Sequence, residues 1–158
     1  MVLIYIIDTS SLIEMKDKYP IDVFPTVWKN MGELYANGRL IAPSEVKKEI
    51  RDDELKNWIK NKKNMFIAPD RFQTKKLKDI LERFPFLAKP DGIGPNADPW
   101  LIALALSKKE EISIFNQDYV IITEESKSKQ KRIPAVANHY GIECINLIEL
   151  FKKEGWRF

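Results

Sequence analysis

Short, unbroken runs of apolar residues recur along the chain, and turn residues separate them from stretches with helical spacing. Val2–Ile7 is such a run, rich in β-branched residues, and 119–123 (YVIIT) is another. Strands that are apolar at every position are typical of a parallel sheet covered on both faces. Shorter runs at 39–43, 65–69 and 142–146 are predicted to add further strands.

Between these runs, apolar residues recur with the period of an α-helix. The spacing i, i+3, i+4, i+7 is clearest in Leu77, Ile80, Leu81 and Phe84. An almost wholly apolar helix starts at Asp98 and is predicted to lie in the centre of the fold. The other predicted helices are 11–19, 23–36, 44–50, 53–62, 134–140 and 147–154. This alternation predicts a single α/β domain over residues 1–158, a three-layer sandwich with a central, mostly parallel sheet between helices.

Composition and charge narrow the class of protein. The chain has 158 residues, of which 44% are hydrophobic and 31% charged, which is ordinary for one globular domain. The net charge of +3 is too small to indicate a polyanionic partner by itself. Cys144 is the single cysteine and is predicted to be buried; it cannot form an internal disulfide, which fits a reducing cytosol. The first apolar run is too short for a signal sequence or a membrane span. We therefore expect a cytoplasmic protein without a membrane partner.

Carboxylates recur where predicted strands end and where the buried helix starts. They are Asp8, Glu45, Glu49, Asp98, Glu124 and Glu125. In parallel sheets, ligands gather at the carboxyl ends of the strands, so these acids are expected to face one crevice. Several ionised carboxylates in one crevice repel each other, and bound cations relieve that repulsion.

The predicted ligands favour Mg²⁺ or Mn²⁺ as the cation. Oxygen ligands without His or Cys select these ions over Zn²⁺, and the single histidine excludes a His-rich zinc site. We interpret that residue, His139, as a structural or surface side chain. A carboxylate-bound metal suits phosphodiester cleavage, because it activates water and stabilises the leaving oxygen without a histidine base.

Each acid also has a local structural interpretation. Asp8 could cap a helix, but Ser11 and Glu14 form a capping-box pattern that predicts the helix start without it. Asp98 is followed by Pro99, which is typical of a capped helix start. The glutamates could equally be surface residues or partners of lysines. These are Glu45, Glu49 and Glu125.

Four blocks, in this order and spacing, resemble the PIN-domain ribonuclease superfamily: IYIIDTSSLI, IAPSEVKKEI, NADPWLIALAL and VIITEES. The C-terminal stretch is similar to one PIN-like branch found in prokaryotes, and reads IPAVANHYGIECINLIELFKKEGW. The resemblance implies a PIN-like fold and a Mg²⁺- or Mn²⁺-dependent endoribonuclease. It assigns four residues as both catalytic residues and metal ligands: Asp8, Glu49, Asp98 and Glu125.

Two of these positions, Glu49 and Glu125, match the superfamily's pattern less directly than the aspartates do. Glu49 fits the second acid because it keeps the superfamily's usual order after Pro43 and Val46. Glu45, one helical turn earlier, is a neighbouring candidate. Glu125 departs from the pattern, because many relatives carry aspartate there, and the longer side chain extends the reach of the fourth ligand.

Hydroxyl and basic residues beside the acids complete the predicted site. Thr9 and Ser10 resemble the hydroxyl residues that commonly support the first acid, and Thr123 precedes the fourth. A cluster of cations follows the fourth acid and is predicted to contact phosphate; a solvated loop is the alternative. Its members are Lys127, Lys129, Lys131 and Arg132.

The resemblance also implies partners. Many PIN relatives are the toxins of type II toxin–antitoxin pairs; they dimerise, and an antitoxin peptide covers the site. An RNA substrate, a protein antitoxin and a second copy are therefore the expected partners. Glu125 keeps open a second hypothesis, a catalytically weak or inactive PIN-like nucleic-acid-binding or scaffold protein. A third, an aspartyl-phosphate phosphatase of the haloacid dehalogenase type, requires a second aspartate where this chain has Ser10.

Overall fold

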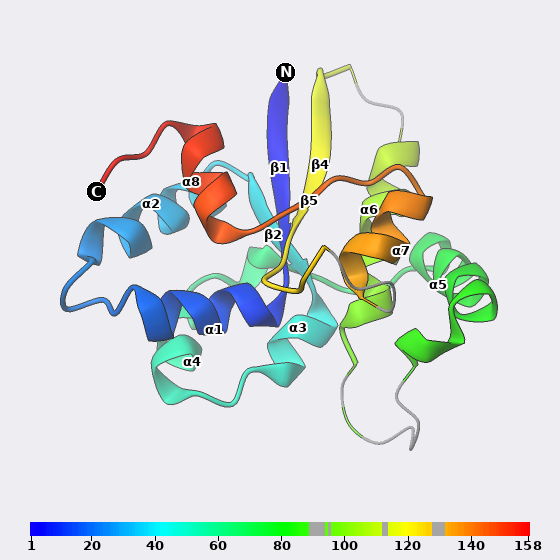
Figure 1. Cartoon of the computed structure of the whole chain (residues 1–158), viewed down its shortest axis with the longest axis horizontal. Helices are drawn as coiled ribbons and strands as arrows, with labels where there is room; N and C mark the ends of the chain where they lie inside the picture. Colours follow the sequence, from blue (N-terminus) through cyan, green and yellow to red (C-terminus); the bar gives the residue numbers. More distant parts are fainter. Residues whose placement is uncertain (89–93, 95, 112–113, 128–131) are drawn as a thin grey trace.

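A sheet of five parallel strands forms the centre of the computed structural model (Figure 1). The strands are β1 (Val2–Ile7), β2 (Leu40–Pro43), β3 (Phe66–Ile67), β4 (Gln117–Ile122) and β5 (Cys144–Ile145). They are hydrogen-bonded in the order β3-β2-β1-β4-β5, so β1 is central and the chain fills one side of it before the other. The structure describes residues 1–88, 94, 96–111, 114–127 and 132–158.

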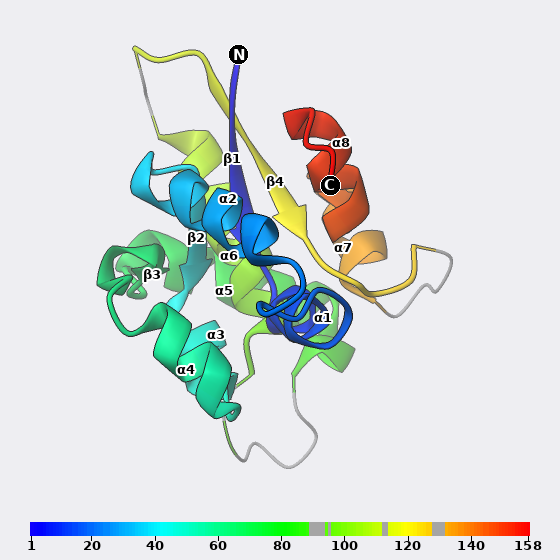
Figure 2. The same cartoon turned by 90° about the vertical axis from the view of Figure 1, so that its left-hand side faces the viewer.

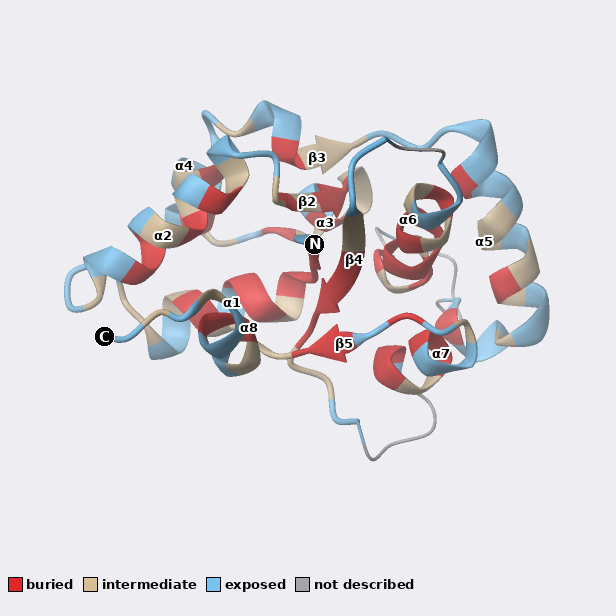
Figure 3. Ribbon diagram, turned by 90° about the horizontal axis from the view of Figure 1, so that it is seen from above, coloured by how far each residue is buried: buried red, intermediate tan, exposed pale blue. Residues whose placement is uncertain are grey.

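Helices cover both faces of the sheet. They are α1 (Thr9–Lys18), α2 (Pro25–Ala36), α3 (Ser44–Glu49), α4 (Asp53–Ile59), α5 (Arg71–Arg83), α6 (Asp98–Glu110), α7 (Ile133–His139) and α8 (Leu147–Glu154), with 3₁₀ turns η1 (Lys63–Met65) and η2 (Pro85–Leu87). Figure 3 shows α5, α6 and α7 on one side of the sheet and α1, α2 and α8 on the other. The predicted α/β sandwich with a parallel sheet is confirmed.

The apolar runs form the core, as their pattern predicts. In β1, Ile4–Ile7 is buried throughout, and so is Tyr119–Ile122 in β4. The apolar helix α6 lies against the sheet with Leu101–Ala105 buried without a break. Each large side chain buried in this way contributes roughly 1.5–3 kcal/mol relative to its exposed state. No helix among the described residues is both long enough and apolar enough to cross a membrane.

The predicted capping of the first helix is wrong. α1 begins at Thr9 rather than at Ser11, and Asp8 takes the N-cap position without a side-chain capping bond. Ser11 lies inside the first turn, fully buried, and its hydroxyl donates to Glu124 at 3.5 Å. A capping box does occur at α8, where Asn146 and Glu149 bond each other's backbone N–H groups.

An ion pair joins the last helix, α8, to the end of the sheet where the strands begin. Arg39 donates to both carboxylate oxygens of Glu154 at 2.9 and 2.6 Å and to the carbonyl of Leu3 at 2.9 Å. The hydroxyl of Tyr5, a fully buried residue of β1, also donates to Glu154. Glu154 therefore holds α8 against β1 and the start of β2.

Removing the charge of this carboxylate is expected to destabilise the protein. Glu154→Gln should lower the free energy of unfolding by about 1–3 kcal/mol, because it leaves a half-buried guanidinium without its anion. Urea unfolding measures the effect. Glu143→Gln is the matched control, since its pair with Lys153 is exposed and worth less than about 1 kcal/mol. Equal losses in the two variants would contradict the assignment.

Candidate active site

The register of the sheet brings the end of β1 beside the end of β4. Ile7 and Ile122 are partners in the parallel pair, so the next residues, Asp8 and Thr123, are neighbours. The Asp8 N–H donates to the carbonyl of Ile122 at 2.8 Å, which fixes the backbone there. The strand order reverses between β1 and β4, and the crevice at such a switch point is where open α/β sheets bind ligands. Figure 2 shows both strands running toward the edge where α1 begins.

Two hydroxyl groups hold the side chain of Asp8. Ser10 and Thr123 donate to the same carboxylate oxygen, Oδ2, at 2.7 and 2.9 Å. Asp8 is only 4% exposed. Burial raises the pKa of Asp8 to about 6, although the two hydroxyl bonds oppose the rise; Glu125 and Glu49 add to it by repulsion. The two hydroxyl groups thus fix the orientation of this carboxylate.

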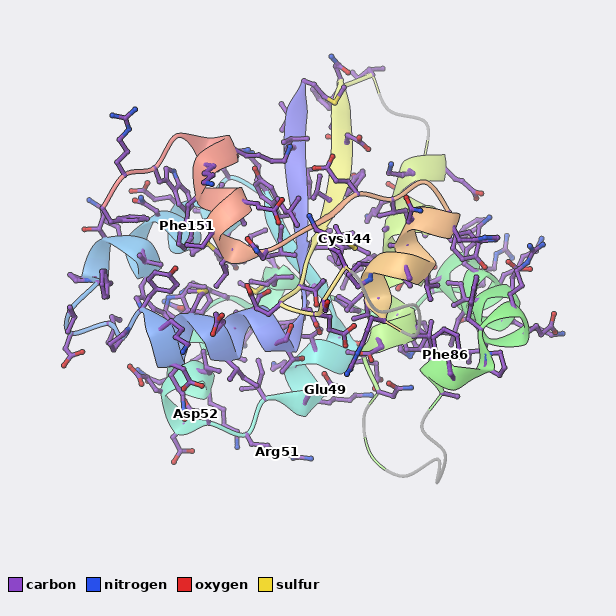
Figure 4. The ribbon with its side chains drawn as sticks, viewed as in Figure 1. Glu49, Arg51, Asp52, Phe86, Cys144 and Phe151 are labelled. Atoms are coloured by element: carbon purple, nitrogen blue, oxygen red, sulfur yellow. The ribbon has the colours of Figure 1, made fainter. Side chains whose placement is uncertain are left out.

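Glu49 lies between the first helix and the segment that leads into α6. Its Oε1 accepts from the hydroxyl of Thr9 at 2.6 Å, and its Oε2 accepts from the N–H of Ala97 at 3.0 Å. Ala97 is the N-cap of α6, where exposed N–H groups and the helix dipole favour negative charge. Figure 4 shows Glu49 on the side of the molecule where β1 and β2 end, whereas Arg51 extends outward.

Asp98 is the first residue of α6, and its side chain does not cap the helix. Burial, together with repulsion from Asp8, Glu125 and Glu49, raises the pKa of Asp98 to about 7, whereas Arg132 opposes the rise. The four predicted acids therefore act on one another electrostatically. The interpretation of Asp98 as an N-cap is wrong, because Ala97 holds that position.

Glu125 has a structural partner of its own. Its Oε2 accepts from the N–H of Ile133, the first residue of α7, at 2.8 Å. Its own N–H donates to the hydroxyl of Thr123 at 3.2 Å. Thr123 therefore links the backbone of Glu125 to the carboxylate of Asp8.

The oxygen atoms of these four carboxylates suit a hard cation, but the side chains are not arranged as a coordination shell. Within the described residues, no three His, Cys, Asp or Glu side chains are arranged so that they could hold a metal ion. Two of the four acids are held by hydrogen bonds within the protein: Glu49 accepts from Thr9 and Ala97, and Glu125 accepts from Ile133. Carboxylates that repel each other in a partly buried crevice are nevertheless the groups a divalent cation would bring together.

The remaining predicted site residues differ in whether they lie near the acids and whether they already have a partner. Glu45 forms an ion pair with Lys48 at 2.8 Å, and the main causes of the raised pKa of Asp8 and of Asp98 do not include it. Lys127 bonds both carboxylate oxygens of Glu149 at 3.1 Å, so it is engaged. Arg132 is exposed beside the acids. Lys129 and Lys131 lie outside the described residues.

Nearly the whole sequence matches a known family. The family is described as a domain of unknown function, DUF4411, and its sequence model matches residues 5–158. The chain belongs to DUF4411. No curated protein and no solved structure matches it. The DUF4411 match spans all four acids of the site but gives no activity for them.

The sequence places Glu124 among the acids of the crevice but predicts no partner for it. Glu124 accepts from the N–H of Leu147 at 3.0 Å and from the hydroxyl of Ser11 at 3.5 Å. Both partners lie far away in the chain, so no local spacing signals the contact. The N–H of Ala97, which holds Glu49, was missed for the same reason.

The raised pKa values predict how the stability of the metal-free protein depends on pH. The folded-state pKa of both Asp8 and Asp98 lies above the ordinary value of 3.8, so the folded protein binds more protons than the unfolded chain between about pH 4 and 7. The free energy of unfolding should therefore fall as pH rises through this window, by on the order of a few kcal/mol. Urea unfolding in EDTA at pH 5 and pH 8 measures the fall.

Asp98→Asn is the variant that assigns this effect. It should be more stable than the wild type at pH 8 and should show a shallower dependence on pH, because one repelling charge is gone. An identical pH dependence in both proteins would show that the titrating groups lie elsewhere.

Proposed function

We propose that this DUF4411 protein is a metal-dependent endoribonuclease that hydrolyses RNA phosphodiester bonds with Mg²⁺ or Mn²⁺. One observation carries the proposal: four carboxylates from β1, α3, α6 and the end of β4 repel one another at the switch point of a parallel sheet. Such an excess of negative charge in a partly buried crevice is unfavourable to folding and is typical of functional sites. The resemblance to PIN-domain ribonucleases supports the same chemistry.

Each residue has a distinct task in this proposal. Four acids would hold the cation: Asp8, Glu49, Asp98 and Glu125. A bound divalent ion supplies an activated water and stabilises negative charge on the phosphate. Ser10 and Thr123 keep Asp8 oriented, as outer-shell partners of metal ligands do. Thr9 keeps Glu49 turned toward α1. Arg132, exposed beside the acids, is positioned to attract the phosphate backbone.

Cleavage assays test the proposal. Mixed-sequence RNA and DNA oligonucleotides are incubated with the purified protein in Mn²⁺, in Mg²⁺ and in EDTA. We expect internal cuts in RNA with either metal and none in EDTA. A protein that binds these oligonucleotides but cuts none of them in either metal would overturn the nuclease.

That last outcome is the one expected of a catalytically weak or inactive PIN-like scaffold. One observation favours this alternative: Glu125 already bonds the N–H of Ile133, so it has a structural function without any metal. The resemblance further predicts that the protein is the toxin of a toxin–antitoxin pair, with a protein antitoxin and a second copy as partners. A cytoplasmic location stays a prediction from the sequence.

A further inference from the structure

Three cavities with shared walls run from the acids across the carboxyl end of β5. Their volumes are about 280, 410 and 420 Å³. The first is bordered by Ser10, Glu125 and Arg132, and therefore adjoins the candidate active site. The second shares Glu125 with the first, and the third shares Pro134 and Cys144 with the second. We call the surface formed by these three adjoining cavities, from Ser10 to beyond Cys144, the β5 groove.

We propose that the β5 groove binds an unpaired nucleobase of the substrate next to the phosphate that is cut, and that it selects bases with an amino group over uracil. This inference rests on the proposed nuclease function and adds a specificity to it. The second cavity, at about 410 Å³, falls within the size of small-ligand sites, roughly 300–1,000 Å³.

The walls of the groove suit a flat ring with polar edges. Pro134, Cys144 and Ile145 are buried apolar residues that line its floor. Glu124 lies on its rim with a fixed orientation, because the N–H of Leu147 and the hydroxyl of Ser11 both donate to its Oε1. No hydrogen bond between described residues engages its other oxygen, Oε2, which leaves an acceptor for a ligand.

A carboxylate on the rim determines which bases fit. It only accepts hydrogen bonds, so it pairs with the exocyclic amino groups of cytosine, adenine and guanine. Uracil offers this carboxylate a single donor, N3–H, between two carbonyl oxygens that repel it, so uracil pairs less well than a base with an exocyclic amino group. Single-stranded RNA is read in this way, through the edges of bases that are splayed out of the stack.

The charges in the groove argue against a phosphate as its occupant. Lys127, which lines two of the cavities, forms an ion pair with Glu149. Glu124 and Glu125 add further negative charge, so the groove favours a neutral ring over an anion. Arg132, which is exposed, lies at the end near the acids, where the backbone phosphate would be.

Cys144 reports directly on occupation of the groove. It is the only cysteine in the chain, and it lines both the second and the third cavity. It is 9% exposed, and burial raises the pKa of its thiol to about 12, so its modification by methyl methanethiosulfonate is expected to be slow. The rate is followed by mass spectrometry in Mg²⁺ with the Asp8→Asn variant, which does not consume the substrate. We expect saturating oligocytidine or oligoadenosine to slow the modification of Cys144 severalfold. Oligouridine should leave the rate unchanged.

A second measurement tests the residue that is proposed to select the base. With the wild type, kcat/KM for oligonucleotides with cytosine at the variable position should exceed that for uracil about tenfold. Glu124→Gln adds a donor to the rim and should reduce this preference to near unity. Glu14→Gln is the matched control, because Glu14 acts on Glu124 electrostatically but does not line the groove.

The possible failures are distinguishable. If RNA is cut without base preference and without protection of Cys144, the groove proposal is wrong and the nuclease stands. If no RNA is cut, the nuclease is wrong, whereas protection of Cys144 by oligocytidine but not oligouridine would still support the base site. Protection by a lysine-rich peptide and by no oligonucleotide would overturn the groove proposal and assign the acidic groove to a basic protein partner.

Discussion

Asp8→Asn and Asp98→Asn are each expected to lower the rate of metal-dependent RNA cleavage by more than roughly 100-fold. Loss of an outer-shell partner of a metal ligand already costs about 10–100-fold in affinity or activity, and loss of a ligand charge should cost more. Both substitutions keep the size of the side chain and remove its charge. Cleavage of a labelled RNA oligonucleotide over a range of Mn²⁺ concentrations measures the loss.

The expected loss of activity is accompanied by a gain in stability. In EDTA, both variants should unfold at a higher urea concentration than the wild type at pH 8, because a buried, repelling carboxylate has been neutralised. Added Mn²⁺ should stabilise the wild type and stabilise the variants less. An inactive variant that is also unstable would point to misfolding. An active variant would exclude that residue from the site.

Glu49→Gln is expected to reduce cleavage by more than roughly tenfold, whereas Glu45→Gln should leave it unchanged. The two glutamates are four residues apart on α3, so helical spacing alone places them on the same face. The structure separates them, since Glu49 is bonded to Thr9 and to the start of α6, and Glu45 to Lys48. Cleavage rates and urea unfolding of the two variants are compared.

The stability of this pair should differ as well. The amide oxygen of Glu49→Gln can accept from the N–H of Ala97 while its NH₂ group donates to the hydroxyl of Thr9, so the substitution loses only the charge assistance of these two bonds, which costs about 1 kcal/mol. Glu45→Gln loses an i,i+3 ion pair worth about 0.2–0.5 kcal/mol. If Glu45→Gln inactivates the protein and Glu49→Gln does not, the second acid has been assigned to the wrong residue.

Much of the fold can be predicted from local pattern. The strand predicted at Val2–Ile7 has these same bounds in the structure, and the apolar helix predicted from Asp98 begins at that residue. Both are long, strongly apolar segments, for which burial overrides other influences. The short strands β3 and β5, of two residues each, were predicted longer than they are, because their ends are set by pairing rather than by composition.

Capping was predicted less well, because a hydroxyl or carboxylate has several partners available to it. Ser11 and Glu14 match a capping box in sequence, yet Ser11 donates to Glu124, which lies 113 residues away. Asp8 occupies the capping position, yet its carboxylate accepts from Ser10 and Thr123. A spacing of three residues cannot show which partner is preferred once distant strands are adjacent.

By itself, the sequence determined the α/β class and the placement of acids where strands end and the central helix starts. These features follow from hydrophobic periodicity and chain direction, which are local properties. Only the tertiary structure decided how the acids are used. The partners of Asp8 and Glu49 include residues 115 and 48 positions away, and the pKa values of Asp8 and Asp98 rise because four chain segments bury and oppose their charges. Burial and Coulomb repulsion depend on distances in space, which the order of residues along the chain does not contain.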